Sequence, residues 1–397
     1  MLATTRTDAG TTVTALTPAD LSTTRWHSET GAPPPDRVVL ADDRLRADAA
    51  HRLISQGAAV LWQGDYHGAR QLLTALARRA EREARPQRAA GTTTPGEAFR
   101  EQRRERARTA GLLGRLVVRL EADHALLLRR APDVRQACRE AYGPSDGPRL
   151  VALRELLGVL GAWQWHQRGV HVPALGARVH PRYGVFAPVR GEYVDLVARA
   201  PIPAAALDGG TVFDLGTGTG VLAAVLARRG AGRVLVTDVN PRALLCARDN
   251  ARRLGLAHRV RAAGTDLYPP GGRRAGLVVC NPPWLPAEPT SVLEQGVYDS
   301  GGRMLHCFLG GLAERLAHGG EGWLILSDLA ERLGLRSRAD LHAAFAAAGL
   351  RVAGRLDTRP RHPRATGATR RTGVRDIDPL GAARAAEVTS LWRLAPA

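Results

Sequence analysis

Lysine is absent from this sequence. All 56 basic residues are arginine, against 38 acidic residues, so the formal net charge at pH 7 is +18. A strongly basic chain favours contact with nucleic acid or another anionic partner. Alanine and glycine are abundant as well, however, and a GC-rich genome produces the same composition through codon usage. The charge alone therefore does not distinguish a functional basic surface from codon bias.

Cysteine is scarce and long apolar runs are lacking. The four cysteines, at 138, 246, 280 and 307, show no CxxC spacing, which indicates free thiols in a reducing compartment rather than a disulfide framework. No run approaches the roughly 20 apolar residues of a membrane span, and the first residues lack the core of a signal peptide. We therefore expect a cytoplasmic monomer with no membrane segment and no bound metal.

Length and pattern divide the 397 residues into three predicted parts. Residues 1–36 are rich in Thr, Ala and Pro, which predicts a disordered tail. Apolar residues at three- and four-residue spacing predict a smaller, mainly helical domain over 37–170, with a β-hairpin over 115–130. The pattern changes again over 171–397, which indicates a second domain. We expect the first of these domains to select the substrate.

The second domain alternates short apolar runs with helical stretches. The runs are TVFDLG, RVLVTD, RVRAA, LVVCNPP, WLILSD, LRVAGRLDTRP and EVTSLWRL. Such runs suit strands that are buried on both faces of a parallel sheet. Their alternation with helices predicts a doubly wound α/β fold.

A glycine-rich turn, FDLGTGTGVLA, follows the first of these predicted strands. Gly216, Gly218 and Gly220 tolerate positive φ and let a ligand approach the backbone closely. The dinucleotide fingerprint needs a further glycine where Val221 stands, so a nicotinamide or flavin cofactor is disfavoured. The turn therefore predicts a nucleoside-type ligand of another kind.

Two aspartates follow the next two predicted strands. Asp238 comes about 20 residues after the glycine turn, where a carboxylate can accept both hydroxyls of a ribose. Asp266 follows the third strand and is placed to meet an adenine amino group. Three nucleoside-directed features in this order favour a ligand site over three unrelated loop residues.

The fourth predicted strand runs into Asn281-Pro-Pro-Trp284. Proline cannot donate to a sheet ladder and pushes the preceding residue away from helix. An amide and an indole are therefore held rigidly at the tip of this strand. A rigid surface turn would explain the prolines but not the asparagine.

Together, DLGTGTG, Asp238, Asp266 and NPPW resemble the class I S-adenosylmethionine-dependent methyltransferases with an Asn-Pro-Pro-aromatic motif. That group includes the release-factor glutamine methyltransferases and the RNA and DNA amino-methyltransferases. The resemblance covers about residues 180–397 and implies a Rossmann-like, mostly parallel, seven-stranded domain with S-adenosyl-L-methionine as cofactor. It implies cofactor contacts from Asp214, Gly216, Thr217, Gly218, Gly220, Asp238, Asp266 and Asn281.

The same resemblance implies that NPPW binds a planar amino group. The side-chain oxygen of Asn281 and the carbonyl of Pro282 can accept its two N–H hydrogens, which favours pyramidalisation of a delocalised nitrogen. Trp284 can stack on the planar group and exclude water. We therefore predict that these three residues are catalytic and that the reaction is N-methylation.

Two further segments are candidates for the substrate side or a lid. Segment 180–196 resembles a segment that closes over the cofactor, so Tyr183, Phe186, Arg190 and Glu192 could line the site. Arg364 and Arg370 belong to a basic insertion that could contact phosphates or an acidic partner. The alternatives are core packing for the aromatic residue and a solvated loop for the arginines.

The substrate itself stays open between several classes. The release-factor enzymes also have a helical N-terminal domain and a hairpin linker, which favours a protein glutamine side chain by analogy. The arginine-rich insertion favours an RNA base, or a DNA base, with an exocyclic amino group. A small-molecule amine and a non-catalytic binding protein with this fold are the remaining alternatives.

Overall fold

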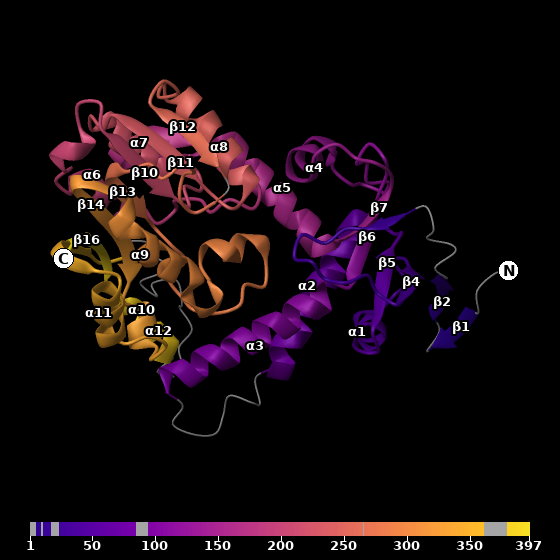
Figure 1. The fold of residues 1–397 in the computed structure, drawn as a ribbon. Coiled ribbons are helices and arrows are strands. Elements are labelled where there is room, and N and C mark those ends of the chain that lie inside the picture. The colour runs from indigo at the N-terminus through magenta and orange to yellow at the C-terminus, as the bar shows by residue number, and fades with distance from the viewer. Residues whose placement is uncertain (1–4, 9–10, 17–23, 85–93, 265, 361–378) are drawn as a thin grey trace. The chain divides into compact units, whose positions relative to one another are not determined.

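The computed structural model describes residues 5–8, 11–16, 24–84, 94–264, 266–360 and 379–397 (Figure 1). The chain divides into two compact units. The N-terminal unit comprises Met1–Thr92 and Glu101–Gln164, and the C-terminal unit comprises Thr93–Arg100 and Trp165–Ala397. The division thus falls a few residues before the predicted boundary, and a short piece of the N-terminal half belongs to the C-terminal unit.

A mixed sheet organises the N-terminal unit, in the order β1-β2-β4-β5-β6-β7-β3. Its three central strands, β4, β5 and β6, are parallel, and β7 runs antiparallel to β6. The strands are β1 Thr5–Asp8, β2 Thr11–Leu16, β3 Arg25–Trp26, β4 Arg37–Ala41, β5 Ala58–Trp62, β6 Leu116–Leu120 and β7 Arg149–Ala152. The helices that lie wholly or mostly in this unit are α1 Ala47–Ser55, α2 Tyr66–Ala84, α3 Pro95–Leu113, α4 Arg135–Tyr142 and α5 Leu153–Arg168. Helices supply many of its residues, as predicted, but the sequence did not indicate the sheet.

The predicted hairpin over 115–130 is wrong. Its first half is strand β6, but β6 pairs with β5 on one side and β7 on the other. The second half forms no strand, and Leu127 is exposed. The reason is burial: Leu116, Val117, Val118 and Leu120 are fully buried in the centre of the sheet, where partners distant in sequence cover both edges.

Part of the predicted disordered tail is ordered. Arg25–Trp26 forms β3 and pairs parallel to Arg149 and Leu150 of β7. The indole N–H of Trp26 donates to the carbonyl of Ala32 at 2.7 Å. A two-residue strand on the sheet edge lacks the alternation that sequence patterns detect, so composition alone suggested disorder here.

The C-terminal unit is built on a second seven-stranded sheet, in the order β12-β11-β10-β13-β14-β16-β15. Strands β10 to β14 pair parallel with one another, and β16 runs antiparallel to both β14 and β15. The strands are β10 Thr211–Leu215, β11 Arg233–Thr237, β12 Val260–Gly264, β13 Ala275–Cys280, β14 Leu316–Ser327, β15 Leu350–Thr358 and β16 Thr389–Pro396. All seven predicted strands are present, and the predicted Rossmann-like, mostly parallel fold is confirmed.

Helices cover both faces of this sheet. The α-helices are α6 Glu192–Arg199, α7 Val221–Arg228, α8 Pro241–Arg253, α9 Arg303–Arg315, α10 Leu329–Arg332, α11 Arg338–Ala347 and α12 Pro379–Ala385. Short 3-10 helices are η2 Pro173–Leu175, η3 Ala204–Ala206, η4 Val292–Gly296 and η5 Ser300–Gly302, and a small hairpin pairs β8 Val170–Val172 with β9 Ala177–Val179.

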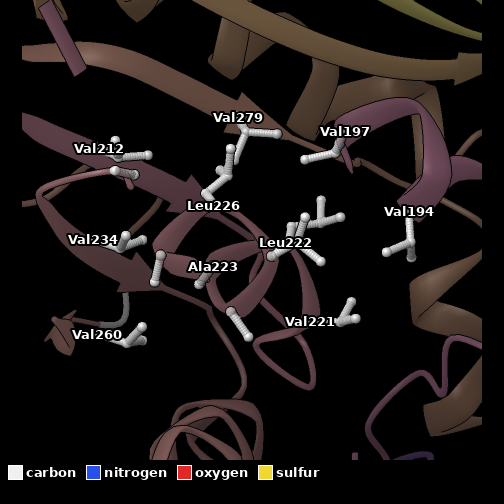
Figure 2. Close-up of a cluster of buried hydrophobic side chains, with 14 of the residues drawn as sticks. Val194, Val197, Val212, Val221, Leu222, Ala223, Leu226, Val234, Val260 and Val279 are labelled. Carbon is white, nitrogen blue, oxygen red and sulfur yellow. The ribbon is translucent and has the colours of Figure 1, made fainter. Parts of the chain in front are cut away.

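Successive strand residues point to opposite faces, which divides the core into two layers. Figure 2 shows one layer, in which valines of β10 to β13 meet Leu222, Ala223 and Leu226 of α7 and valines of α6. The other layer holds Phe213 and Val278 against the apolar residues of α9 and α11. The sheet is therefore buried on both faces, as its continuous apolar strands predicted.

The order in which strands are added to the sheet reverses between β10 and β13, which are parallel neighbours. Helix α7, which follows β10, packs on one face, whereas α9, which follows β13, packs on the other. Open parallel sheets bind ligands in the crevice beyond the carboxyl ends of the strands at such a switch point. In the ladder, Leu215 at the end of β10 lies opposite both Thr237 and Cys280. The register thus brings the loops after β10, β11 and β13 together.

Candidate active site

The glycine turn after β10 adopts the conformation that its sequence predicts. Gly216, Gly218 and Gly220 all have positive φ, at 67°, 54° and 76°. A Cβ added at Gly220 would lie 2.9 Å from the Cβ of Ala247, so this position has no room for a side chain. A Cβ at Gly216 would lie 2.5 Å from the terminal carbon of Met304, whereas Gly218 has open space beside its backbone, so a ligand can approach the turn closely at Gly218.

Asp214, the last but one residue of β10, stabilises this turn from below. Its buried carboxylate accepts the hydroxyl of Thr217 at 2.6 Å and the N–H of Ala223 at 3.1 Å, both on Oδ2. Burial raises the pKa of Asp214 to about 6, although these two hydrogen bonds act to lower it. Asp214 and Thr217 therefore shape the loop, and their predicted contact with the cofactor stays a prediction.

Asp238 follows β11 and lies directly beside the glycine turn. Its Oδ2 accepts the N–H of Gly218 and its Oδ1 accepts the N–H of Asn240, each at 2.9 Å. Burial raises the pKa of Asp238, and the two backbone hydrogen bonds lower it. A carboxylate oxygen can accept more than one hydrogen bond, so both oxygens keep capacity for the hydroxyls of a ribose.

Asp266 lies at the same edge of the sheet, just beyond the end of β12. It is exposed, and it lies two residues after Gly264, the last residue of that strand. The carbonyl of the following residue, Leu267, accepts the hydroxyl of Thr237 at 2.6 Å, which ties this turn to the end of β11. The position suits the predicted contact with an adenine, which stays a prediction.

The Asn-Pro-Pro-Trp segment begins where β13 ends at Cys280. Asn281 and Trp284 are half-buried, and Pro282 is buried. The indole N–H of Trp284 donates to Oδ1 of Asn281 at 2.9 Å. Trp284 also packs against both core layers of the unit. The amide and the indole are therefore held side by side, as the two prolines predicted, and a hydrogen bond joins them.

The candidate lid segment, residues 180–196, passes close to this site. A Cβ added at Gly296, in the loop after NPPW, would lie 2.9 Å from the Cβ of Phe186, so Phe186 packs against that loop. A Cβ added at Gly218 would lie 4.0 Å from the carbonyl oxygen of Phe186. The segment thus runs between the glycine turn and the loop that follows the motif.

Arg190 and Glu192 form a buried ion-pair cluster. Arg190 donates from Nε to Glu192 at 2.7 Å and from Nη1 to the two carboxylate oxygens of Glu387 at 3.2 and 3.3 Å. Both glutamates are only 2–3% exposed. The guanidinium carbon lies 5.2 Å from the ring centroid of Trp284. Arg190 therefore contacts the motif directly, and Glu387 is a residue of this site that sequence reasoning missed.

Arg364 and Arg370 lie outside the described residues. Within the described ranges, no three His, Cys, Asp or Glu side chains gather closely enough to hold a metal ion. No helix in the same ranges is long and apolar enough to cross a membrane. The monomeric state and the cytoplasmic location remain predictions.

The strand order, the glycine turn at the switch point and the aspartate beside it define a nucleoside-binding α/β domain of the Rossmann-like class. Residues 178–332 match the model of one family, the methyltransferase small domain. This part of the chain is therefore similar to a family of S-adenosylmethionine-dependent methyltransferases, and the open backbone at Gly218 and the Asp238 carboxylate beside it are compatible with that cofactor.

Curated relatives match only over short segments. Ribosomal protein L11 methyltransferase of Pelotomaculum thermopropionicum is 49% identical over 73 residues, which is 18% of this chain and 24% of that protein. Release factor glutamine methyltransferase of Cereibacter sphaeroides is 40% identical over 84 residues, 21% of this chain and 30% of that protein. The chain thus spans less than a third of the length of these two relatives.

Solved structures resemble the chain more weakly. The ribosomal protein L11 methylase of Lactobacillus delbrueckii subsp. bulgaricus aligns with a TM-score of 0.35 and 18% identity, over 53% of this chain and 81% of that one. A geranyl diphosphate methyltransferase in complex with SAM aligns with a TM-score of 0.39 and 15% identity, over 52% and 85% of the two chains.

Proposed function

We propose that the protein transfers the methyl group of S-adenosylmethionine to the nitrogen of a planar amide, the side chain of a glutamine in another protein. The observation that carries this proposal is the Asn281 side-chain amide, which is fixed by Trp284 at the tip of β13 beside the glycine turn. A fixed acceptor at this place suits a delocalised nitrogen, which needs to be oriented rather than deprotonated.

Different residues around the glycine turn would bind different parts of the cofactor. Asp238 would accept the ribose hydroxyls, the backbone of Gly216 to Gly220 would contact the amino-acid part of the cofactor, and Asp266 would meet the adenine. When bound, the cofactor supplies an electrophilic methyl group on a sulfonium. The positive charge of that sulfonium is compatible with the acidic residues Asp214 and Asp238 near the loop. The protein thus contributes position and electrostatics, as is usual for cofactor enzymes.

Two hydrogen bonds from the substrate to the protein would orient the acceptor nitrogen for methyl transfer. The substrate amide donates one N–H to Oδ1 of Asn281 and the other to the carbonyl of Pro282. Both bonds hold the nitrogen and favour pyramidalisation, which directs its lone pair out of the amide plane. The methylated nitrogen is acidic and loses its proton to solvent, so no strong base is required.

The choice of protein over nucleic acid rests on the relatives. Segments of two release factor glutamine methyltransferases, 40% and 45% identical over 84 and 78 residues, align with this chain. The alternative is an exocyclic amino group of an RNA or DNA base, which also is planar and delocalised. The net charge of +18, carried by arginine alone, is the observation that favours this second candidate.

The test is methyl transfer from labelled cofactor into a bacterial extract and into purified release factor. We expect protease treatment to release the label, nuclease treatment to leave it in place, and hydrolysis to yield N5-methylglutamine. Extract treated with the Asn281→Ala protein serves as the matched control and should stay unlabelled. Label that nuclease alone releases would replace the protein substrate by the nucleic-acid substrate.

A further inference from the structure

We propose that Trp284 sets the orientation of the Asn281 side-chain amide, and that Arg190, fixed by Glu192 and Glu387, holds Trp284 in place. The inference rests on the proposed function, because it concerns the residue that receives the methyl-acceptor nitrogen. It makes Trp284, Arg190 and Glu387 positioning residues, which act on the substrate through Asn281.

The chemistry of the indole decides which way the amide faces. An asparagine amide has one end that accepts hydrogen bonds and one end that donates them. The indole N–H of Trp284 can only donate, so at 2.9 Å it requires the oxygen of Asn281 opposite it. A flipped amide would place two N–H groups against each other and would present a donor to the substrate amino group. The hydrogen bond therefore selects the amide orientation that accepts from the substrate.

Oδ1 of Asn281 can serve both partners at once. A carbonyl oxygen has two lone pairs, and Trp284 occupies one of them. The second remains for one N–H of the acceptor nitrogen. Phenylalanine at position 284 would keep an aromatic ring over the site but would leave the amide free to rotate. Trp284→Phe therefore distinguishes the contribution of the indole N–H from that of the aromatic ring.

The ion-pair cluster gives Trp284 its fixed position. Arg190 covers the indole at 5.2 Å from the ring centroid, and three hydrogen bonds to two buried carboxylates hold its guanidinium. A cation over an aromatic face is attracted by the ring quadrupole, and more strongly where water is excluded. Glu387 is 197 residues from Arg190 in sequence and lies just before β16. The cluster therefore ties the lid segment and the end of the sheet to the motif.

The covered face changes the predicted role of Trp284. The sequence suggested that this ring stacks on the planar substrate. Since Arg190 lies over the ring, at most one face is left for a substrate. Trp284 also packs against both core layers, which restrains it further. Fixing Asn281 is the function for which the described contacts provide direct support.

The first test follows the seven tryptophan indole N–H signals by 15N-resolved NMR of the full chain, without cofactor or substrate. Trp284→Phe identifies the signal of interest by removing it. We expect Asn281→Ala, Arg190→Lys and Glu387→Gln each to shift that signal. Arg355→Lys is the matched control, because Arg355 lies 4.8 Å from the ring of another tryptophan, Trp392. A Trp284 signal that ignores all three variants would overturn the proposal.

The second test is a double-mutant cycle on turnover. Trp284→Phe should lower kcat about tenfold, the effect of one hydrogen bond, and leave the affinity for S-adenosylmethionine unchanged. A carboxylate has two equivalent oxygens and no orientation to select, so Trp284→Phe should cost less in the Asn281→Asp background. Equal factors in the two backgrounds would mean that the ring only packs, and would overturn the positioning role.

The two tests separate this inference from the proposed function. Shifted indole signals without any methyl transfer to protein would contradict the proposed substrate and leave the positioning network standing. Methyl transfer to glutamine with an unmoved Trp284 signal would do the reverse. If the Asn281→Asp protein shows no turnover, the NMR experiment alone decides.

Discussion

Both units place an aspartate beyond the carboxyl end of a parallel strand, but the partners of the two aspartates differ. In the N-terminal unit Asp65, after β5, accepts the backbone N–H of His67 at 2.8 Å and in addition is bound by Nε of Arg130 at 2.6 Å. In the C-terminal unit Asp238, after β11, accepts two backbone N–H groups. The guanidinium beside Asp65 lowers its pKa to about 2, whereas burial raises the pKa of Asp238.

The difference shows when such a carboxylate is available to a ligand. An arginine neutralises the charge and occupies an oxygen with a strong, charge-assisted hydrogen bond. Backbone N–H groups fix the orientation of the carboxylate and leave its charge. Asp65 borders a cavity of about 520 Å³, but two ion pairs, Arg129–Asp43 and Arg130–Asp65, are part of its lining. Position at the strand end is therefore a weaker signal than the identity of the partners.

Gly68 and Gly218, one glycine from each unit, differ in a similar way. At Gly68 of the N-terminal unit an added Cβ would lie 2.4 Å from Oδ1 of Asp43, a side chain of the same unit. At Gly218 of the C-terminal unit the nearest atom would be 4.0 Å away. The first glycine makes room for the protein's own carboxylate, whereas the second leaves space beside the backbone. Only the second arrangement suits a bound ligand.

The largest expected effect tests whether chemistry belongs to the C-terminal unit alone. Asn281→Ala should reduce turnover by roughly 10²–10³-fold, the usual result of removing one positioned hydrogen-bonding group from a reacting centre. Affinity for S-adenosylmethionine, measured by calorimetry, should stay near that of the parent, because Asn281 faces the acceptor. Parent-like turnover in this variant would contradict the amino-group mechanism.

The second-largest expected effect concerns the affinity for S-adenosylmethionine and Asp238, whose carboxylate is held by backbone N–H groups. Asp238→Ala should weaken binding of S-adenosylmethionine by about 1.5–3 kcal/mol for each hydrogen bond that is lost to the charged group. Calorimetry on the purified full chain measures this directly. Asp65→Asn in the N-terminal unit is the control and should bind like the parent. Equal affinity of the parent and the Asp238→Ala protein would reject the ribose assignment.

Asp214 allows a test of burial through pH. Its pKa of about 6 lies above the 3.8 of an ordinary aspartate, so the unfolded chain loses this proton first as the pH rises. The free energy of unfolding should therefore fall by about 2–3 kcal/mol between roughly pH 4 and 6, relative to Asp214→Asn. The asparagine keeps an oxygen for both hydrogen bonds, which makes it a matched reference. Denaturant unfolding that gives a constant difference over this window would contradict the buried, proton-binding carboxyl.

The two units also differ in how far their sequences revealed them. In the C-terminal unit the strands are short apolar runs, and β10, β11 and β14 each lead to a helix within six residues, so local pattern was sufficient for all seven strands. In the N-terminal unit β5 and β6 are separated by helices α2 and α3, and β6 pairs with β7 from beyond α4. Pairing over comparable distances also occurs between β10 and β13, so the difference lies in the strands themselves: β5 is a short apolar run between two helices and reads as part of a helical pattern.

The candidate site likewise combines features that local sequence predicts with features that depend on distant contacts. The glycine turn, Asp238 and the NPPW motif lie at strand ends and were predicted from their places in the sequence. The cluster of Arg190, Glu192 and Glu387 depends on a tertiary contact across 197 residues. The sequence signal for this cluster was Glu387, an acidic residue that lies shortly before the last strand in an arginine-rich region. The hydrogen bond between Trp284 and Asn281 needed side-chain geometry, since sequence gives adjacency but not orientation.

The smallest expected effect returns to Asp65. Its pKa of about 2 lies below the 3.8 of an ordinary aspartate, so the unfolded chain binds this proton first as the pH falls. The stability from the Arg130 pair should be present above about pH 4 and should disappear as the pH falls toward 2. Asp65→Asn should remove that pH dependence without changing cofactor affinity, because the pair stabilises the N-terminal unit alone. Denaturant midpoints at several pH values measure the first effect and calorimetry the second. If Asp65→Asn weakened cofactor binding as Asp238→Ala does, the distinction between arginine-paired and backbone-held carboxylates would fail.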